Sequence, residues 1–285
     1  MSIAYPELSQ VGRLGNQMWE IASTIGIARK AGQQPAFPKW DYQPFFSLPE
    51  EFFVDEPHGR HATEFVRYMD PRARAYLQDY NLFKDVEDEI KGYFQPSTKA
   101  KRILNKIWKE QFAPVVGDKK VLSIHVRRGD NVTHPEGYHP LRSMDYYRGA
   151  LEEIELSVCA KVVFSDDPEW CRENLPKAFG FELDLYYEGV ARPREYVDRV
   201  SYEAAPVLDW VDLQLMARCD YHIISNSTYA WWGAFLSKDS SPFYPCHQSW
   251  FGPHIAPWTK AELMFPSHWL PIHDPTMGGS NAHVH

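Results

Sequence analysis

The sequence contains no C-x-x-C pair, so it lacks the usual spacing of a structural zinc site. Its four cysteines all lie in the second half of the 285 residues, at Cys159, Cys171, Cys219 and Cys246. Neither a metal cluster nor a disulfide framework is indicated, and we expect reduced, buried thiols. Net positive charge is also absent, because the formal net charge is -8. A nucleic-acid partner needs a net basic face, so this balance argues against one and leaves room for a small anionic substrate.

Long apolar runs are missing as well. No stretch approaches the roughly 20 apolar residues that a membrane span needs. The N-terminal residues have no basic segment followed by an apolar run, so they do not read as a signal peptide. The phosphate-binding pattern G-x-x-x-x-G-K-[ST] occurs nowhere, which argues against a P-loop kinase or sulfotransferase. We therefore expect a soluble, cytoplasmic protein with no membrane span.

The first half of the chain has one strong helical signal. A short apolar stretch at 3–5 leads into a glycine-bearing loop at 12–16, after which apolar residues recur at helical spacing from Met18 to Ile25. Asn16 is the expected N-cap of this helix and Gly32 the expected stop. The segment 33–74 is rich in proline and aromatic residues and predicts loops with short strands, whereas 83–91 and 97–112 predict helices.

The second half alternates strands and helices. The β-branched run 121–126 predicts a buried strand. Further strands are expected at 161–165 and 221–225, and helices at 143–156, 168–175, 208–217 and 227–236. This alternation favours a parallel sheet in an α/β layer. The segment 113–118 looks like a connector, so we predict two α/β lobes with a boundary near residue 115.

The sequence H-V-R-R-G-D at 125–130 places two arginines directly after a predicted buried strand. Ligands of open α/β sheets bind at the carboxyl ends of strands, and the planar guanidinium suits a pyrophosphate. Because side chains alternate along a strand, His125 and Arg127 should share one face, with Arg128 pointing the other way. We expect Arg127 to bind phosphates and Arg128 to pair with a carboxylate such as Asp130. The alternative is a strand-end ion pair without any ligand.

The sequence S-N-S-T-Y-A-W-W-G-A-F at 225–235 joins a strand to an apolar helix. A helix start offers backbone N–H groups and a positive dipole end, and the hydroxyls of Ser227 and Thr228 add donors for an anion. Simple N-capping by Ser227 is the alternative, and both can hold together. Trp231 and Trp232 are expected in the core rather than in a sugar platform.

A third pattern, G-R-L-G-N-Q-M at 12–18, brings Arg13 and Asn16 to a strand-to-helix turn. With these three motifs in this order, the chain resembles the α-1,2-fucosyltransferases of glycosyltransferase family 11, over roughly residues 10–245. More distantly it is similar to α-1,6- and protein O-fucosyltransferases. The resemblance implies an α/β fold of the GT-B type, with two Rossmann-like lobes around a donor/acceptor cleft. The N-terminal acceptor-side lobe would be 1–115 and the C-terminal GDP-sugar-binding lobe 116–285.

The resemblance also implies residue roles. Arg127 matches the arginine that holds the donor pyrophosphate, and His125 borders the nucleotide. Ser227 and Thr228 match the phosphate-binding pair, which Tyr229 follows. Asp212 matches an acidic residue that recognises guanine in the α-1,6 relatives. The alternative is that Asp212 is a solvent-exposed helix residue without a ligand. Arg13 and Asn16 match positions facing the donor, and Arg128 completes the set of expected substrate-binding residues.

The acidic pair Asp166–Asp167 follows a predicted strand, which is where metal-dependent transferases often hold a cation. However, Asp167 followed by Pro168 is a strong helix start, with an N-cap and then proline at the first helical position. We favour the cap, and the resembling family works without metal. We therefore expect no metal and no cofactor besides the donor substrate GDP-fucose.

The implied reaction is an inverting transfer of L-fucose from GDP-β-L-fucose to a glycan hydroxyl, α-1,2 to galactose. Arg127 would stabilise the charge that develops on the departing GDP. The loop 131–139 holds three candidate bases, His134, Glu136 and His139. Glu136 lies one place from the position where the α-1,6 relatives have a glutamate that acts as a base. The expected partners are a nucleotide sugar and a glycan acceptor, with no nucleic acid. The segment 37–80 should shape the acceptor site. A transferase for another GDP sugar and a non-catalytic glycan- or nucleotide-binding protein remain alternatives.

Overall fold

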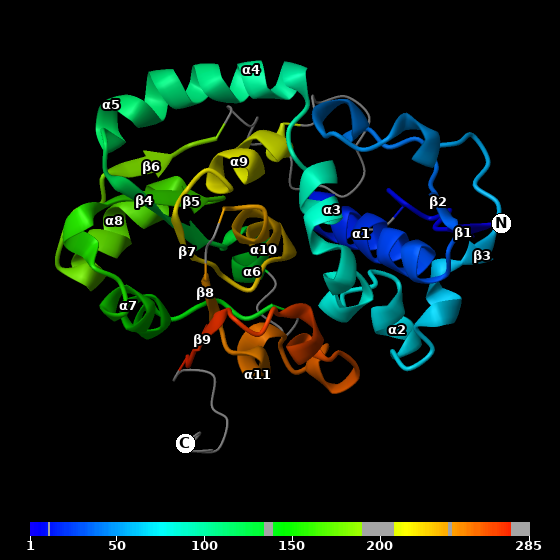
Figure 1. Cartoon of the computed structure of the whole chain (residues 1–285). Helices are drawn as coiled ribbons and strands as arrows, with labels where there is room; N and C mark the ends of the chain where they lie inside the picture. The colour runs from blue at the N-terminus through cyan, green and yellow to red at the C-terminus, as the bar shows by residue number, and fades with distance from the viewer. Residues whose placement is uncertain (11, 134–138, 190–207, 239–240, 275–285) are drawn as a thin grey trace.

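The computed structural model describes residues 1–10, 12–133, 139–189, 208–238 and 241–274. Within these ranges the chain forms two parallel sheets (Figure 1). The smaller has the order β2-β1-β3, and the larger has the order β6-β5-β4-β7-β8-β9. The strands are β1 Ser2–Ala4, β2 Gln34–Ala36, β3 Arg60–His61, β4 Lys120–Val126, β5 Cys159–Ser165, β6 Leu185–Tyr187, β7 Tyr221–Ile223, β8 Phe243–Pro245 and β9 Leu270–Ile272. The predicted α/β fold, with one parallel sheet in each half as a GT-B arrangement requires, is confirmed.

Helices connect the strands and pack on the sheets. Those of the first half are α1 Leu14–Lys30, α2 Pro71–Arg74, α3 Glu87–Tyr93, α4 Thr98–Ile107 and α5 Ala113–Val116. Those of the second half are α6 Gly129–Thr133, α7 Met144–Glu152, α8 Pro168–Phe179, α9 Asp209–Met216, α10 Thr228–Phe235 and α11 His247–Trp250. The helices α4 and α5 run along one side of the molecule, above the larger sheet in the view of Figure 1.

Most predicted elements are present, with shifted ends. The segment 113–118 is only partly a connector, since Ala113–Val116 forms α5 and a π-helical turn at Trp108–Phe112 joins it to α4. Asn16 is not the N-cap of α1, because the helix begins at Leu14 with Arg13 in the cap position. Gly32, with φ 64°, follows the last turn of α1 as expected. The boundary near residue 115 separates the two sheets, but the division into lobes of 1–115 and 116–285 stays a prediction.

One hydrophobic core runs across both halves, because α1 packs on α10. The Trp19 ring lies 4.4 Å from that of Trp231 and 5.7 Å from that of Trp232, between ring centroids. Trp231 and Trp232 are both fully buried, so their expected place in the core is confirmed. The burial of these large aromatic surfaces provides the main driving force that holds α1 against α10.

The four cysteines all lie in described ranges and are free, and Cys159, Cys171 and Cys219 are buried, as expected. In the described part of the chain, no helix has the length and apolar character that crossing a membrane requires.

One buried group in α1 makes folding pH-dependent. Glu20 is fully buried, and neither of its carboxylate oxygens has a hydrogen-bond partner among the described residues. Burial, helped by the negative charge of Glu7, raises the pKa of Glu20 to about 9. The folded protein therefore keeps this carboxyl protonated at neutral pH, whereas the unfolded chain ionises it above its ordinary value of 4.5.

Unfolding consequently releases a proton between those two pKa values, so Glu20 lowers stability as pH rises. Through this one group, the free energy of unfolding falls by at most about 1.4 kcal/mol for each pH unit. We expect Glu20→Gln to stabilise the protein by about 2 kcal/mol at pH 8 and by much less at pH 5. Urea unfolding at the two pH values, with the exposed Glu262→Gln as control, measures the difference. An equal effect of Glu20→Gln at both pH values would contradict a neutral Glu20.

Candidate active site

Two arginines and two aspartates meet at the carboxyl ends of β4 and β5. These strands are paired in parallel with Val126 opposite Ser165, so Arg127 and Asp166 both follow the last rung. Nη1 of Arg127 donates to Asp166 in an ion pair whose side chains are 17% and 15% exposed. The other oxygen of Asp166 accepts the backbone N–H of Arg128 at 2.8 Å. Arg127 therefore lies at the carboxyl end of the sheet, as expected, and its ion pair with Asp166 orients its guanidinium.

Arg128 pairs with a carboxylate, as the sequence predicts. Its Nε donates to Asp167 at 2.9 Å, and its guanidinium carbon lies 3.7 Å from the ring centroid of Trp170. The carboxylate that the structure shows beside it is Asp167, whereas the side chain of Asp130 lies outside what the structure describes. Arg127 and Arg128 thus pair with successive residues of the turn between β5 and α8. The expectation that the two arginines point in opposite directions stays a prediction.

Asp167 also confirms its expected role as a helix cap. Its side chain accepts the backbone N–H of Trp170 at 3.2 Å, with Pro168 at the first position of α8. Both members of the acidic pair are therefore bound to arginines and backbone N–H groups. Among the residues with described positions, no three histidine, cysteine, aspartate or glutamate side chains cluster as a metal site would need. The expected independence from metal stays a prediction.

The turn between β7 and α10 adjoins the end of β4. The Nδ1 of His125 and the hydroxyl of Ser225 lie 2.8 Å apart in a hydrogen bond. His125 is only 6% exposed, so it supports this turn from below the surface. Ser227 is the N-cap residue of α10, but its side chain makes no capping hydrogen bond. The simple N-capping alternative for its hydroxyl is therefore not what the structure has.

The start of α1 approaches the start of α10 so closely that only glycine fits. A Cβ on Gly15 would lie 2.6 Å from the backbone nitrogen of Tyr229 and 2.9 Å from Oγ1 of Thr228. The Thr228 hydroxyl donates to Oδ1 of Asn16 at 2.9 Å, and the indole of Trp232 donates to the carbonyl of Gly15 at 2.9 Å. Two helix N-termini, with their positive dipole ends, thus converge beside the end of β4.

The remaining predicted substrate-binding residues surround this convergence. Arg13 is exposed at the N-cap of α1. The Tyr229 hydroxyl donates to the carbonyl of Asp209, which ties α10 to α9. Asp212, one turn further along α9, is 9% exposed, so the solvated-position alternative for this carboxylate is wrong. A Cβ on Gly189 would lie 3.1 Å from its Oδ2.

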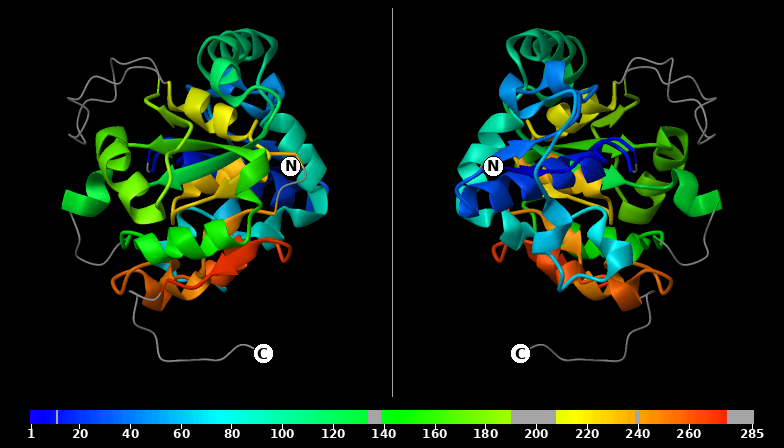
Figure 2. Two further views of the ribbon diagram at one scale, coloured as in Figure 1. Left: turned by 90° about the vertical axis from the view of Figure 1, so that its left-hand side faces the viewer. Right: turned by 90° about the vertical axis from the view of Figure 1, so that its right-hand side faces the viewer.

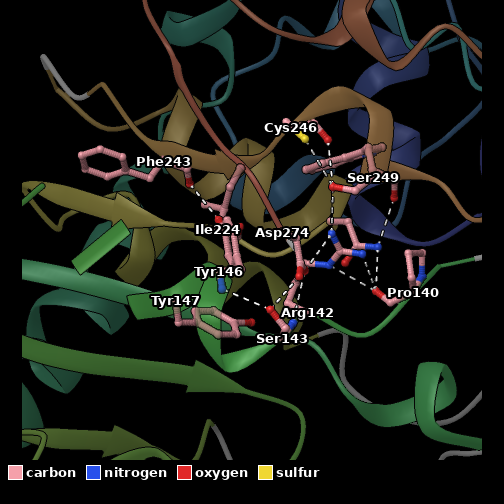
Figure 3. Close-up of polar contacts among 12 residues, drawn as sticks. Pro140, Arg142, Ser143, Tyr146, Tyr147, Ile224, Phe243, Cys246, Ser249 and Asp274 are labelled. Carbon is pink, nitrogen blue, oxygen red and sulfur yellow. Dashed lines mark hydrogen bonds and ion pairs between the residues drawn. The ribbon is translucent and has the colours of Figure 1, made fainter. Parts of the chain in front are cut away.

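A buried ion pair that the sequence did not predict anchors the loop after the arginines. Arg142 and Asp274 have side chains 1% and 0% exposed, with Nη1 and Oδ2 3.5 Å apart (Figure 3). Nη2 of Arg142 donates to the carbonyl of Pro140 at 3.1 Å, and the Ser143 hydroxyl donates to Asp274 at 2.6 Å. Asn226 donates to the same Pro140 carbonyl at 3.0 Å, so this network fixes the loop's end against the β7–α10 turn.

The sequence held no signal for this network. Arg142 lies among polar and proline residues, and Asp274 lies near the end of the chain, where nothing in the pattern predicts complete burial. Of the loop 131–139, the candidate bases His134 and Glu136 lie outside the described residues. The third, His139, is described, and its ring centroid lies 5.8 Å from that of Phe251.

The arrangement has the chemistry of an anion site. The start of α1, the start of α10 and the end of β4 are joined by hydrogen bonds from Asn16 to Thr228 and from His125 to Ser225. These three segments carry two helix N-termini, the hydroxyls of Ser227 and Thr228, and the guanidinium of Arg127. Each of these groups favours negative charge. The three motifs, far apart in the sequence, are therefore brought together as expected, whereas the role of each single residue stays a prediction.

Comparison with known proteins agrees with the motifs. The model of "Glycosyl transferase family 11" matches residues 29–244. The O-antigen biosynthesis glycosyltransferase WbnK of Escherichia coli is 30% identical over 186 residues, which cover 62% of this chain and 54% of that protein. An α-1,2-colitosyltransferase of Escherichia coli is 25% identical over 195 residues, covering 61% and 60%. A galactoside α-(1,2)-fucosyltransferase 1 of Sus scrofa is 23% identical over 261 residues, covering 82% and 64%.

The chain thus spans between about half and two thirds of the length of these relatives. Among solved structures, POFUT1 in complex with GDP matches with a TM-score of 0.47 at 11% identity, covering 85% of this chain and 97% of that one.

Proposed function

The chain belongs to glycosyl transferase family 11, and from this we propose that it is an inverting, metal-independent fucosyltransferase that uses GDP-β-L-fucose. The acceptor is a glycan hydroxyl, with an α-1,2 linkage to galactose. The observation that carries the proposal is the meeting of the α1 and α10 N-termini beside the β4 end that bears Arg127. That is a site for a diphosphate, which a GDP sugar supplies. The names of the relatives support the sugar class and the linkage.

In the proposed reaction, the bond between C1 of the sugar and the β-phosphate oxygen breaks, and GDP leaves with that electron pair. Arg127, oriented by Asp166, and the N–H groups at the start of α10 stabilise the charge that develops on the diphosphate. Arg13 and Asn16 act from the start of α1. Two arginines and two helix ends supply the positive charge that a metal supplies elsewhere.

The acceptor oxygen attacks C1 from the opposite face, so the β-linked donor gives an α-linked product, and its proton passes to a base. Glu136 keeps this role as a proposal. Asp212 accepts hydrogen bonds from the N1–H and the exocyclic amine of guanine. Two observations support that assignment. Asp212 is almost completely buried, and the hydrogen bond from Tyr229 ties its helix, α9, to α10, whose start is the proposed phosphate site.

The test is GDP release from GDP-fucose with and without a galactose-terminated acceptor, in EDTA. We expect acceptor-dependent release that EDTA leaves unchanged, with a fucosylated product detected by mass spectrometry. Faster turnover of another GDP sugar in a donor panel would support a different donor, which the colitosyltransferase relative keeps open. GDP binding without release from any donor would support the non-catalytic alternative and overturn the enzyme proposal.

A further inference from the structure

A cavity outside the proposed phosphate site lies between a segment of the first half of the chain and a segment of the second half. Its volume is about 340 Å³, and it is walled on one side by 68–73 and on the other by 257–263. These are the segment leading into α2 and the segment after α11, and both lie on the lower side of the molecule in Figures 1 and 2. Small-molecule sites take about 300–1,000 Å³, so the cavity is large enough for one or two sugar rings.

The cavity walls combine aromatic rings with a few polar groups. Tyr68, whose side chain is 52% exposed, lies on one side, and Trp258 on the other. Asp70, Thr259 and Lys260 provide an acceptor, a hydroxyl and a donor. The single negative and single positive side chains balance, so the cavity favours a neutral ligand over an anion or a cation. A pyranose fits this chemistry, because its apolar face packs on rings while its hydroxyls need both donors and acceptors.

Hydrogen bonds link one cavity wall to the proposed phosphate site. The Tyr68 hydroxyl donates to Asp79, which is 3% exposed. The neighbouring Gln78 donates to Oδ1 of Asn16 at 3.1 Å, and this same oxygen accepts the Thr228 hydroxyl. Three side chains and one peptide unit therefore connect Tyr68 with Thr228 at the start of α10.

We propose that this cavity binds the acceptor, a neutral oligosaccharide, with a sugar ring packed on Trp258 or Tyr68 and its hydroxyls bound by Asp70 and Thr259. The inference rests on the proposed function and names the residues that recognise its second substrate. It assigns to 68–73 and 257–263 the acceptor recognition that the sequence placed only broadly in 37–80.

The experiment uses two substitutions in the cavity. Trp258→Leu keeps apolar bulk but removes the flat ring, and Asp70→Asn keeps the shape but removes the charge. We expect each to raise the acceptor KM by about tenfold or more. The KM for GDP-fucose and the slow GDP release without acceptor should stay unchanged. Asp55→Asn, at an exposed aspartate elsewhere in the first half, is the matched control and should alter none of these values.

A binding readout separates this inference from the enzyme proposal. Saturation-transfer NMR with lactose needs no turnover, so it reports on the cavity even if no GDP is released. Signal from lactose in the wild type that Trp258→Leu abolishes supports the cavity whatever the activity. An unchanged lactose signal and an unchanged acceptor KM in both variants would overturn the cavity assignment, while leaving the fucosyltransferase proposal standing if GDP release occurs.

Discussion

Replacing Arg127 by alanine is expected to lower acceptor-dependent GDP release by about 10²–10³-fold. Its guanidinium is held at the end of β4 by Asp166, and the structure places the neighbouring His125 against the turn that begins α10. A preorganised donor at a departing diphosphate acts mainly in the transition state, because the negative charge grows as the C1–O bond breaks. The expected loss is therefore larger in kcat than in the KM for the donor.

The measurement is steady-state GDP release, together with GDP affinity by calorimetry. Arg127→Lys should recover only part of the activity, because an ammonium lacks the two parallel donors of a guanidinium. Arg172→Ala removes an exposed arginine that pairs with Glu188 in the same half, and it should retain full activity. An Arg127→Ala enzyme with normal turnover would show that Asp166 and Arg127 form a structural ion pair and nothing more.

Asp274→Ala is expected to cost about 3–5 kcal/mol of unfolding free energy, the largest stability effect we foresee. The substitution leaves the Arg142 guanidinium buried without its counter-charge (Figure 3). Burial already lowers the pKa of Arg142, and Asp274 is the first of the charges that oppose this effect. The substitution also removes the acceptor of the Ser143 hydroxyl, which caps α7.

Urea unfolding followed by tryptophan fluorescence measures this cost. Asp145→Asn breaks the exposed i,i+3 pair with Arg148 and should change stability by less than about 1 kcal/mol. Because Arg142 holds the Pro140 carbonyl that Asn226 also binds, Asp274→Ala should in addition weaken GDP binding at temperatures where it remains folded. Equal stability of Asp274→Ala and Asp145→Asn would mean that the buried pair contributes no more than a surface pair.

The elements were largely predictable because their signals are local. The β-branched run became β4, the i, i+3, i+4 pattern after Gly15 became α1, and Asp167-Pro168 became the start of α8. Each depends on burial periodicity or on turn chemistry within a few residues. Predictions failed where neighbours in space decided instead. Asn16 lost its expected capping role because α1 begins two residues earlier, and its side chain turns to Thr228.

By itself, the sequence determined the strand–helix order, the family, and the three polar motifs that the fold must place. Only the tertiary structure decided their partners: Arg128 with Asp167, Asn16 with a threonine 212 residues away, and Arg142 with Asp274. The reason is physical. Local periodicity records which side of an element is buried, whereas the partner of a polar group depends on which distant elements pack together and how closely. At Gly15 the absence of a single Cβ sets that distance.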